Sequence, residues 1–341
     1  MKETVAVEDA VGMVLPHDIT EIVKDSHKGR AFKKGHIIQP EDIERLKRIG
    51  KEHIYVLTLN DDEIHENEAA ERLADALLGE GAVPSSEPVE GKINILAQRD
   101  GLLKINKDAL YRFNLLGEVM CATLHNNTPV NQGELIGGTR LIPLISERAV
   151  VDKAVAICAS SEPVIQVKAL QARKVGLVIT GGEVFKGLIE DKFEPVLRKK
   201  VGGFGSEVVK VCFAPDDVQI IRDEIHGCIE AGAELVVTSG GMSVDPDDVT
   251  RTAIQEAGAT EIVYGTPVLP GAMFLSGRIG DVPILGVPAC GMFHKITVLD
   301  LILPRVLVGE SITREDIARM GHGGLCRNCK KCQYPVCNFG K

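Results

Sequence analysis

The C-terminal half of the chain alternates apolar, β-branched runs with helical patterns, and this alternation constrains the fold more than any other feature. The composition of buried strands is found in KVGLVIT, SEVVKVCF, ELVVTSGG, TEIVYG and VPILGVP. Between them, DDVQIIRDEIHGCIEAG places Ile221, Ile225 and Ile229 four residues apart, which predicts one buried helical face. Alternation of this kind predicts an α/β fold, a mostly parallel sheet with helices on both faces.

The chain of 341 residues is long enough for several domains, and its charge and its pattern of apolar residues change along its length. Ten acids and a single Arg72 mark residues 61–90, whereas short apolar runs broken by DG, NN, QG and GG pairs follow residue 92. We predict five parts: an N-terminal α+β segment (1–60), an acidic helix and linker (61–91), a small β-rich domain (92–170), the α/β domain (171–310) and a four-cysteine tail (320–341).

Charge and composition exclude several classes of protein. The formal net charge of −9 and the absence of Trp disfavour binding to a nucleic-acid polymer, which needs a basic face and stacking side chains. No apolar run approaches the roughly 20 residues of a membrane helix, and acids interrupt the N-terminal region where an export signal would need an apolar core. We therefore expect a cytoplasmic protein that binds small molecules.

Two loops of the α/β part follow strands and share a Thr, a pair of glycines and a helix start. One loop is TGGEVFKG and the other is TSGGMSVDPDDV. Glycines let backbone N–H groups approach an oxyanion, hydroxyls add donors, and a following helix favours negative charge. The pattern predicts a phosphate-binding site whose candidates are Thr180, Gly181, Gly182, Thr238, Ser239, Gly240, Gly241 and Ser243.

Three acids, Asp245, Asp247 and Asp248, follow the second loop. One alternative is that they do no more than cap a helix that begins at Pro246, with Asp245 as its N-cap. However, three carboxylates would repel a phosphate bound beside them, and Mg²⁺ between the two removes this conflict. We expect a phosphate ester bound together with Mg²⁺, with Asp245 as a metal ligand.

These motifs resemble the molybdopterin-binding domain. The resemblance covers about residues 173–308 and includes GTPVLPGAMF and ILGVPACG downstream. That domain is shared by molybdopterin adenylyltransferases, molybdopterin molybdenumtransferases and the competence-damage-inducible family. The resemblance implies an α/β fold, a pterin phosphate held by the second loop, and acidic residues around the metal and reaction centre. The catalytic candidates are Asp245, Glu183 and Asp248, and Pro270, Gly271, Pro288 and Cys290 complete the cofactor-binding candidates.

The sequence also departs from the molybdenumtransferases. Their first motif resembles TGDE, whereas Gly182 stands here at the carboxylate position, and Cys290 stands at the Asn of their PGNP loop. A stretch like DNSAMDGYA is missing from the N-terminal segment. Ligand binding therefore carries over better than catalysis. Cys290 could be a reactive thiol with a lowered pKa at a helix start, or a small residue in a tight turn.

The last residues hold a C-x2-C-x2-C-x4-C array formed by Cys326, Cys329, Cys332 and Cys337. A reducing compartment disfavours structural disulfides, and four thiolates suit Zn²⁺ or a [4Fe–4S] cluster. The alternative is a disordered, redox-labile tail. The four cysteines that stand alone in apolar or mixed contexts are expected to be small buried hydrophobes: Cys121, Cys158, Cys212 and Cys228.

Three functions remain open. The favoured one is an enzyme of molybdenum cofactor biosynthesis, a Mg²⁺-dependent transferase that inserts molybdate into adenylated molybdopterin with AMP release, or that adenylylates molybdopterin. The second is a non-catalytic carrier or sensor of molybdopterin, and the third a nucleotide pyrophosphate hydrolase of the competence-damage-inducible type. We expect a homo-oligomer, with the tail available to dock a molybdoenzyme or redox partner.

Overall fold

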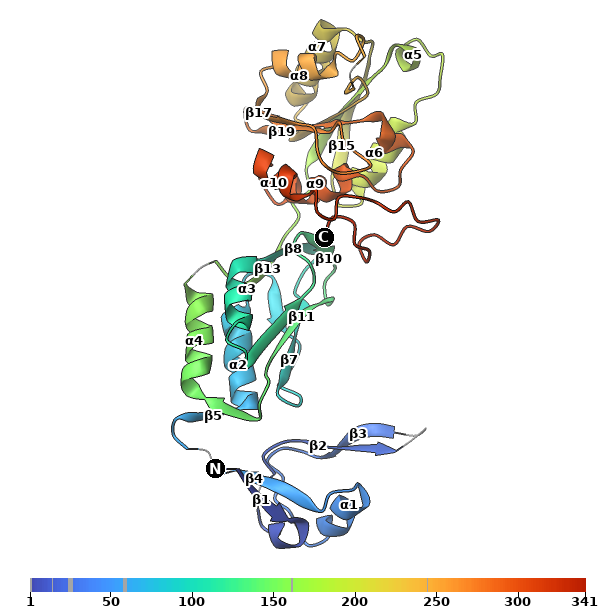
Figure 1. Ribbon diagram of the computed structural model, residues 1–341. Coiled ribbons are helices and arrows are strands. Elements are labelled where there is room, and N and C mark those ends of the chain that lie inside the picture. The colour runs from blue at the N-terminus through green and yellow to red at the C-terminus, as the bar shows by residue number, and fades with distance from the viewer. Residues whose placement is uncertain (1, 14, 24–26, 58–59, 161, 244) are drawn as a thin grey trace. The chain divides into compact units, whose positions relative to one another are not determined.

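The structure is a computed structural model that describes residues 2–13, 15–23, 27–57, 60–160, 162–243 and 245–341. The chain forms two compact units (Figure 1). Unit 1 comprises Met1–Arg99, Lys104–Leu124 and Asn131–Val167, and unit 2 comprises Asp100–Leu103, His125–Val130 and Lys168–Lys341. No helix within the described ranges is both long and apolar enough to cross a membrane.

A six-stranded sheet in the order β15-β14-β16-β19-β18-β17 forms the centre of unit 2 (Figure 1). Its strands are β14 (Lys174–Thr180), β15 (Glu207–Ala214), β16 (Leu235–Ser239), β17 (Thr260–Tyr264), β18 (Leu275–Ile279) and β19 (Val282–Val287). Strands β15, β14, β16 and β19 pair in parallel, whereas β18 runs antiparallel to both β19 and β17. The predicted α/β fold with a mostly parallel sheet is confirmed.

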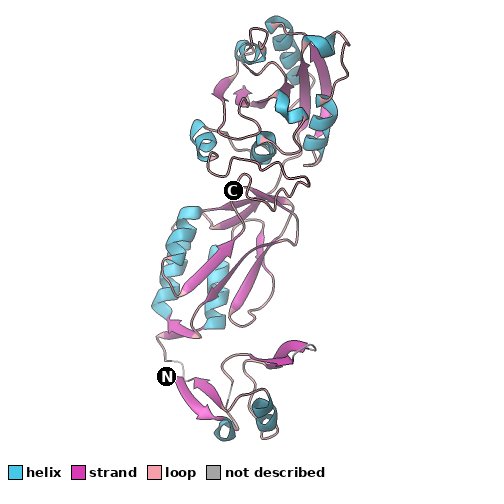
Figure 2. Cartoon of the chain, turned by 45° about the vertical axis from the view of Figure 1, so that its right-hand side comes forward, coloured by secondary structure: helices cyan, strands magenta, loops and turns pink. Residues whose placement is uncertain are grey.

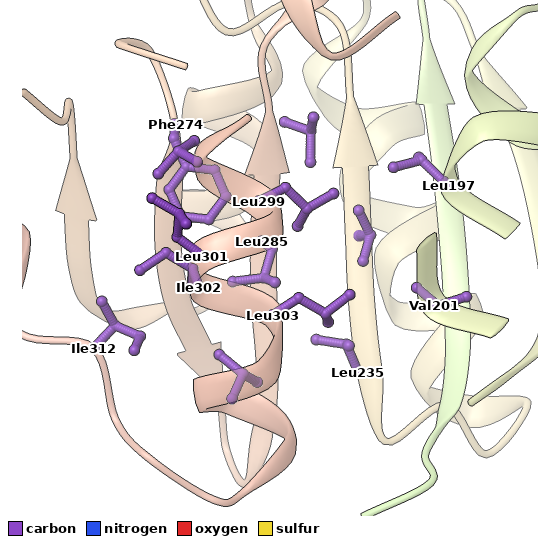
Figure 3. Close-up of a cluster of buried hydrophobic side chains, with 14 of the residues drawn as sticks. Leu197, Val201, Leu235, Phe274, Leu285, Leu299, Leu301, Ile302, Leu303 and Ile312 are labelled. Atoms are coloured by element: carbon purple, nitrogen blue, oxygen red, sulfur yellow. The ribbon is translucent and has the colours of Figure 1, made fainter. Parts of the chain in front are cut away.

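Helices cover both faces of this sheet, because its strands are apolar on both sides. On β14, Val175, Leu177 and Ile179 join one buried cluster and Val178 joins the other. The first cluster includes side chains of α6 (Phe193–Gly202) and α9 (Val298–Leu307), and the second includes those of α7 (Val218–Glu230) and α8 (Thr250–Glu256). Figure 3 shows Leu299 and Leu303 beside Leu285 and Leu235 of the sheet. Each such leucine contributes about 1.5–3 kcal/mol by leaving water.

The start of α9 is fixed by a capping box and a buried ion pair. Thr297 is the N-cap, and the Asp300 side chain accepts the Thr297 backbone N–H. The Lys200 ammonium of α6 lies 2.6 and 2.7 Å from the two Asp300 carboxylate oxygens, and it also donates to the Lys295 carbonyl at 2.9 Å. These contacts hold the segment before α9 against α6.

Two predicted helices of unit 2 have different bounds. The alternating pattern of the sequence predicts a helix over residues 184–197, and the structure has two helices there instead, α5 (Gly182–Phe185) and α6. The helix expected from Pro246 begins only at Thr250, and Asp245 does not cap it. Instead, the Asp248 carboxylate accepts the Asp245 backbone N–H at 3.0 Å, which closes a turn before α8. The remaining helices of unit 2 are η2 (Ala289–Met292, a 3-10 helix) and α10 (Arg314–Arg319).

Unit 1 begins with small paired strands around a helix. The sequence predicts a helix opened by Pro40 and Glu41 and then a strand that ends near Leu57. The structure has α1 (Asp42–Arg48) and β4 (His53–Leu57) there, and Leu46 of α1 is fully buried. The other strands before residue 100 are β1 (Lys2–Ala6), β2 (Ile19–Val23), β3 (His27–Phe32), β5 (Glu63–His65), β6 (Ala82–Pro84) and β7 (Lys92–Ala97), and η1 (Val7–Ala10) is a 3-10 helix.

The acidic helix α2 (Glu66–Leu77) packs on strands rather than serving only as a connector. Its inner face buries Leu73 and Leu77, and Ala70 and Ala74 cluster with Ile93 of β7. The region predicted to be β-rich also contains two helices, α3 (Lys107–Asn114) and α4 (Arg148–Ala159). The sequence of this region did not indicate them, because its many turn signals favour short strands. Its strands are β8 (Gly101–Ile105), β9 (Val119–Thr123), β10 (Thr128–Val130), β11 (Leu135–Leu141), β12 (Ile145–Glu147) and β13 (Ile165–Lys168). Figure 2 distinguishes helices, strands and loops in both units.

Candidate functional site

A cavity of about 370 Å³ lies at the carboxyl ends of β16 and β19, the edge where open α/β sheets bind ligands. Loops that are distant in the sequence line it: Gly241, Met242, Ser243, Asp248, Leu269, Pro270, Gly271, Ala272, Met273, Pro288, Ala289 and Cys290. The structure thus brings together seven of the predicted site residues, namely Gly241, Ser243, Asp248, Pro270, Gly271, Pro288 and Cys290.

The loop after β16 requires its glycines. Gly240 and Gly241 have φ angles of +84° and +57°, which favour glycine. A Cβ at Gly240 would lie 2.4 Å from the Thr180 carbonyl oxygen, and one at Gly241 would lie 2.3 Å from Thr250 Oγ1. The loop therefore packs tightly between the end of β14 and the start of α8, which fixes the direction of its backbone N–H groups.

The predicted threonines serve this packing. Thr180 Oγ1 donates to the Ser239 carbonyl at 2.8 Å and lies 2.9 Å from Thr250 Oγ1. Thr238 is fully buried, with its hydroxyl 3.5 Å from the Leu285 carbonyl. Both threonines thus hold the loop rather than face the cavity. The Ser239 hydroxyl differs, because it is buried and lacks a hydrogen-bond partner among the described residues. An unpaired buried hydroxyl is costly, but Ser239 is fully buried and does not line the cavity.

The predicted catalytic acids do not converge on one point. Asp248 lines the cavity and is half-buried, whereas Glu183 is exposed in the short helix α5 and Asp245 is exposed on the loop after β16. Within the described ranges, no three His, Cys, Asp or Glu side chains stand close enough together to hold a metal ion. A Mg²⁺ site completed by ligand phosphate needs only one or two carboxylates, so Asp248 fits the first of them.

Asp216 is a site residue that sequence reasoning missed. It follows β15, and its carboxylate accepts the Gly182 backbone N–H at 2.8 Å. The same oxygen lies 3.2 Å from the place of a Cβ at Gly182. A neighbouring strand end thus places a carboxylate beside Gly182, although Asp216 does not line the cavity. An acid two residues after the end of a strand was the available signal, but only the pairing of β15 with β14 brings it to Gly182.

The loops on the far side of the cavity pack against α9 and η2. Gly271 has a φ of +130°, and a Cβ there would lie 2.4 Å from Val298 Cγ1. Cys290 lies within the short helix η2 and is half-buried. Burial raises the pKa of the Cys290 thiol, which favours the second of the two alternatives, a small residue in a tight turn, over a reactive thiol. A Cβ at Gly291 would lie 2.9 Å from Val287 Cγ1, and small residues in a tight turn account for this segment.

The four-cysteine tail is folded onto unit 2. Leu269 donates its N–H to the Gly324 carbonyl and accepts the Cys326 N–H, both at 2.8 Å. Phe339 is buried in the same cluster as α9, and Tyr334 and Cys337 pack against that cluster. The alternative of a disordered tail is therefore wrong. The four cysteines line one cavity of about 620 Å³: Cys326, Cys329, Cys332 and Cys337.

The four cysteines that stand alone are buried, as predicted: Cys121, Cys158, Cys212 and Cys228. Burial raises the pKa of the Cys121 thiol to about 12 and that of Cys158 to about 11. Thiols held this firmly in the protonated form are structural rather than reactive.

Comparison with known families locates two matches along the chain. Residues 176–308 match the family described as "Probable molybdopterin binding domain", and residues 4–58 match a domain of unknown function. A CinA-like protein of Thermosipho melanesiensis is 30% identical over 92 residues, which are 27% of this chain and 23% of that protein. A CinA-like protein of Mycobacterium sp. (strain MCS) is 27% identical over 109 residues, 32% of this chain and 24% of the relative. The chain thus spans about a quarter of the length of these relatives.

Solved structures align with 40% of this chain. The molybdopterin biosynthesis enzyme MoaB of Thermus thermophilus aligns over 40% of this chain and 98% of its own, with 23% identity and a TM-score of 0.35. The protein CinA of Thermoplasma acidophilum aligns over 40% and 98%, with 15% identity and a TM-score of 0.36.

The matched residues run from β14 to the end of α9, so they include the parallel strands, the glycine loop after β16 and the cavity that the loops enclose. Residues 176–308 of this chain therefore belong to the molybdopterin-binding domain superfamily.

Proposed function

We propose that this protein binds molybdopterin, or its adenylated form, in the cavity between the loops after β16 and β19. The observation that carries the proposal is the glycine loop inside the matched domain, where Gly240 packs on Thr180 and Gly241 brings the backbone to the wall of the cavity. The backbone N–H groups of this loop and the exposed Ser243 hydroxyl would hold the pterin phosphate.

For the reaction we propose a molybdenumtransferase-like step. An oxygen of molybdate attacks the phosphoanhydride bond between the pterin phosphate and AMP, that bond breaks, AMP leaves, and molybdenum is inserted into the pterin. A bound Mg²⁺ would neutralise the charge that develops on the phosphates. Asp248 in the cavity wall is its proposed ligand, with Asp245 and Glu183 on the rim and Asp216 supplying the carboxylate that Gly182 lacks. Rigid backbone donors at the loop would stabilise the same charge without reorganising.

The CinA-like relatives favour a second candidate, hydrolysis of a nucleotide pyrophosphate. This reaction uses the same phosphate loop and Mg²⁺, but water replaces molybdate and no pterin is needed. A third possibility is a molybdopterin carrier or sensor, which the exposed positions of Glu183 and Asp245 support.

The experiment that separates the three functions follows AMP by chromatography. The anaerobically purified full-length protein is incubated with adenylated molybdopterin and Mg²⁺, with and without molybdate. Molybdate-dependent AMP release that falls about 100-fold in Asp248→Asn would support the transferase, since removing a positioned charge costs on this order. Asp247→Asn, an exposed acid outside the cavity lining, is the matched control.

The other outcomes are equally specific. Tight binding without AMP release supports the carrier. Hydrolysis of ADP-ribose without use of the pterin supports the pyrophosphate hydrolase. No binding of either ligand contradicts the proposal.

We also propose that the tail binds a thiolate-ligated metal, either zinc or an iron–sulfur cluster. We further propose that the protein forms homo-oligomers and that its tail docks a molybdoenzyme or redox partner. The support for the metal is that all four tail cysteines line a single cavity.

A further inference from the structure

The cavity of the tail cysteines is separate from the pterin cavity, and the reaction proposed above makes no use of it. It measures about 620 Å³ and is bounded by the segment before α9 and by the tail. All four tail thiols line it, and none of the five other cysteines does, although all five lie within the described ranges. Four thiols gathered on one cavity are a soft-metal ligand set, and the question is which metal they hold.

The spacing favours iron over zinc. Structural zinc sites typically take their thiolates as two separated pairs, each with a short spacing. Here Cys326, Cys329 and Cys332 follow one another with two residues between successive cysteines, and Cys337 comes four residues later. Three cysteines at successive x2 spacings followed by a fourth are typical of bacterial [4Fe–4S] sites, although the fourth spacing there is three residues and a proline follows.

The size of the cavity points the same way. A single zinc ion draws four sulfurs to about 2.3 Å from one point, which leaves no space between them. In this protein the four thiols line a cavity of about 620 Å³ rather than the walls of a narrow crevice. A cubane of four irons and four sulfides places one iron in front of each thiolate, so its cysteines stay well apart and its inorganic core fills the space between them.

The surroundings match the charge and the chemistry of a cluster. Lys295 and Arg327 line the cavity, and no acid occurs in residues 321–341. A [4Fe–4S]²⁺ core with four thiolates carries two negative charges, which these cations offset. Ile296 and Tyr334, both half-buried, supply apolar surface to the wall of the cavity. Burial and neighbouring charge are the features by which proteins tune such clusters.

We propose that Cys326, Cys329, Cys332 and Cys337 hold a [4Fe–4S] cluster in this cavity. On assembly, four thiol protons are released and four iron–thiolate bonds form. Two ferrous ions, two ferric ions and four sulfides make up the core, so no electron is taken from or given to the protein. The proposal does not depend on pterin binding and stands or fails separately from it.

Reconstitution of the full-length protein tests the proposal. The protein is incubated without oxygen with equal amounts of ferrous and ferric iron, with sulfide and with zinc in competition, and is then desalted. About four irons and four sulfides per chain, with the visible absorption of a thiolate-bound cluster, are expected. One zinc per chain and no iron would assign a zinc centre and overturn the proposal, and a protein without metal would reject the site altogether.

Two variants make the result specific. Cys329→Ser removes an exposed thiol, so it is expected to fold normally by circular dichroism and to retain less than a quarter of the iron. Cys290→Ala removes a half-buried thiol that does not line the cavity of the tail cysteines, and this variant is expected to retain all of the iron. Equal iron in the two variants would contradict the ligand assignment.

Discussion

At the scale of single residues, the glycine loop after β16 offers the sharpest test, because Thr180 and Thr250 leave no space for a side chain at its two glycines. Gly241 has a φ of +57° and a virtual Cβ 2.3 Å from Thr250 Oγ1, whereas Gly280 has a φ of +54° and no atom within 4 Å of its virtual Cβ. Both alanine variants therefore carry the backbone cost of about 1 kcal/mol, but only Gly241→Ala adds a clash.

We expect Gly241→Ala to lower the free energy of unfolding by about 1–3 kcal/mol more than Gly280→Ala does. We also expect it to weaken Mg²⁺-dependent binding of adenylated molybdopterin at least about tenfold, while Gly280→Ala leaves binding unchanged. Urea denaturation and titration calorimetry measure the two effects. Equal losses of stability in both variants would mean that Thr250 moves aside and that the loop is not held rigidly.

The same residues show what a sequence can reveal about a site. The glycines were predictable, because only a close backbone approach explains paired glycines between a strand and a helix. The role of Thr180 was not, since its hydroxyl is bound to the Ser239 carbonyl, 59 residues away in sequence. Asp216 was missed for a similar reason: its contact with Gly182 depends on which strands are neighbours, and local sequence does not contain strand order.

At the scale of elements, the sequence predicted the strands and helices better than the loops between them. The apolar runs that form β14, β16 and β19 are buried on both faces, so their composition already indicates buried strands. The predicted start of α8 at Pro246 was wrong. Asp245 and Pro246 satisfy the local rules for a helix N-terminus, but the Asp248 carboxylate closes a turn there instead.

The end of α9 is joined to α10 by a charge network that makes stability depend on pH. Arg305 is buried and lies 2.8 Å from both Glu310 and Asp316. Burial opposes ionisation of Asp316, but hydrogen bonds from Thr313 and Arg305 outweigh it and lower the pKa of Asp316 to about 2. Because this pKa is depressed below its ordinary value of 3.8, the stabilisation is complete above pH 4 and is lost as the pH falls towards 2.

We therefore expect Asp316→Asn to lower the free energy of unfolding by about 1–2 kcal/mol at pH 7, with the difference from the wild type shrinking between pH 4 and pH 2. The fully exposed Asp281 provides a control, and Asp281→Asn should follow the wild type throughout. Denaturation curves at several pH values measure the difference. A constant difference across this range would show that the contact stabilises by packing rather than by charge.

The tail and the pterin cavity meet at one residue. Leu269 lines the pterin cavity, and its backbone N–H and C=O pair with Gly324 and Cys326 of the tail. Metal held by the tail cysteines should therefore also order the loop that carries Pro270 and Gly271. Removing the metal, by chelation or in Cys329→Ser, is expected to weaken binding of adenylated molybdopterin about fivefold or more, the usual scale of coupling between sites. Unchanged affinity in calorimetric titrations would show that the two cavities act independently.

At the scale of the whole molecule, each unit has its own buried core. The clusters on the two faces of the six-stranded sheet belong to unit 2, and the clusters around Leu46 and around Ala70 belong to unit 1. The sequence indicated the change of texture at residue 173, because strand–helix alternation begins there. It did not indicate that α2 packs on β7, since an acidic helix followed by a Pro- and Ser-rich stretch has the composition of a linker.

Separate cores predict separate responses to truncation and to ligand. Leu285 of β19 and Leu73 of α2 are both fully buried, so Leu285→Ala and Leu73→Ala should each cost about 2–5 kcal/mol. We expect calorimetry to resolve two unfolding transitions, with Leu285→Ala lowering one and Leu73→Ala lowering the other, each by about 5 °C or more. Adenylated molybdopterin with Mg²⁺ should raise only the transition that Leu285→Ala lowers, because a ligand stabilises the unit that binds it. If each variant moved both transitions equally, the two cores would unfold as one cooperative body, and the ligand would then stabilise the α1 and α2 regions as strongly as the sheet that contacts it.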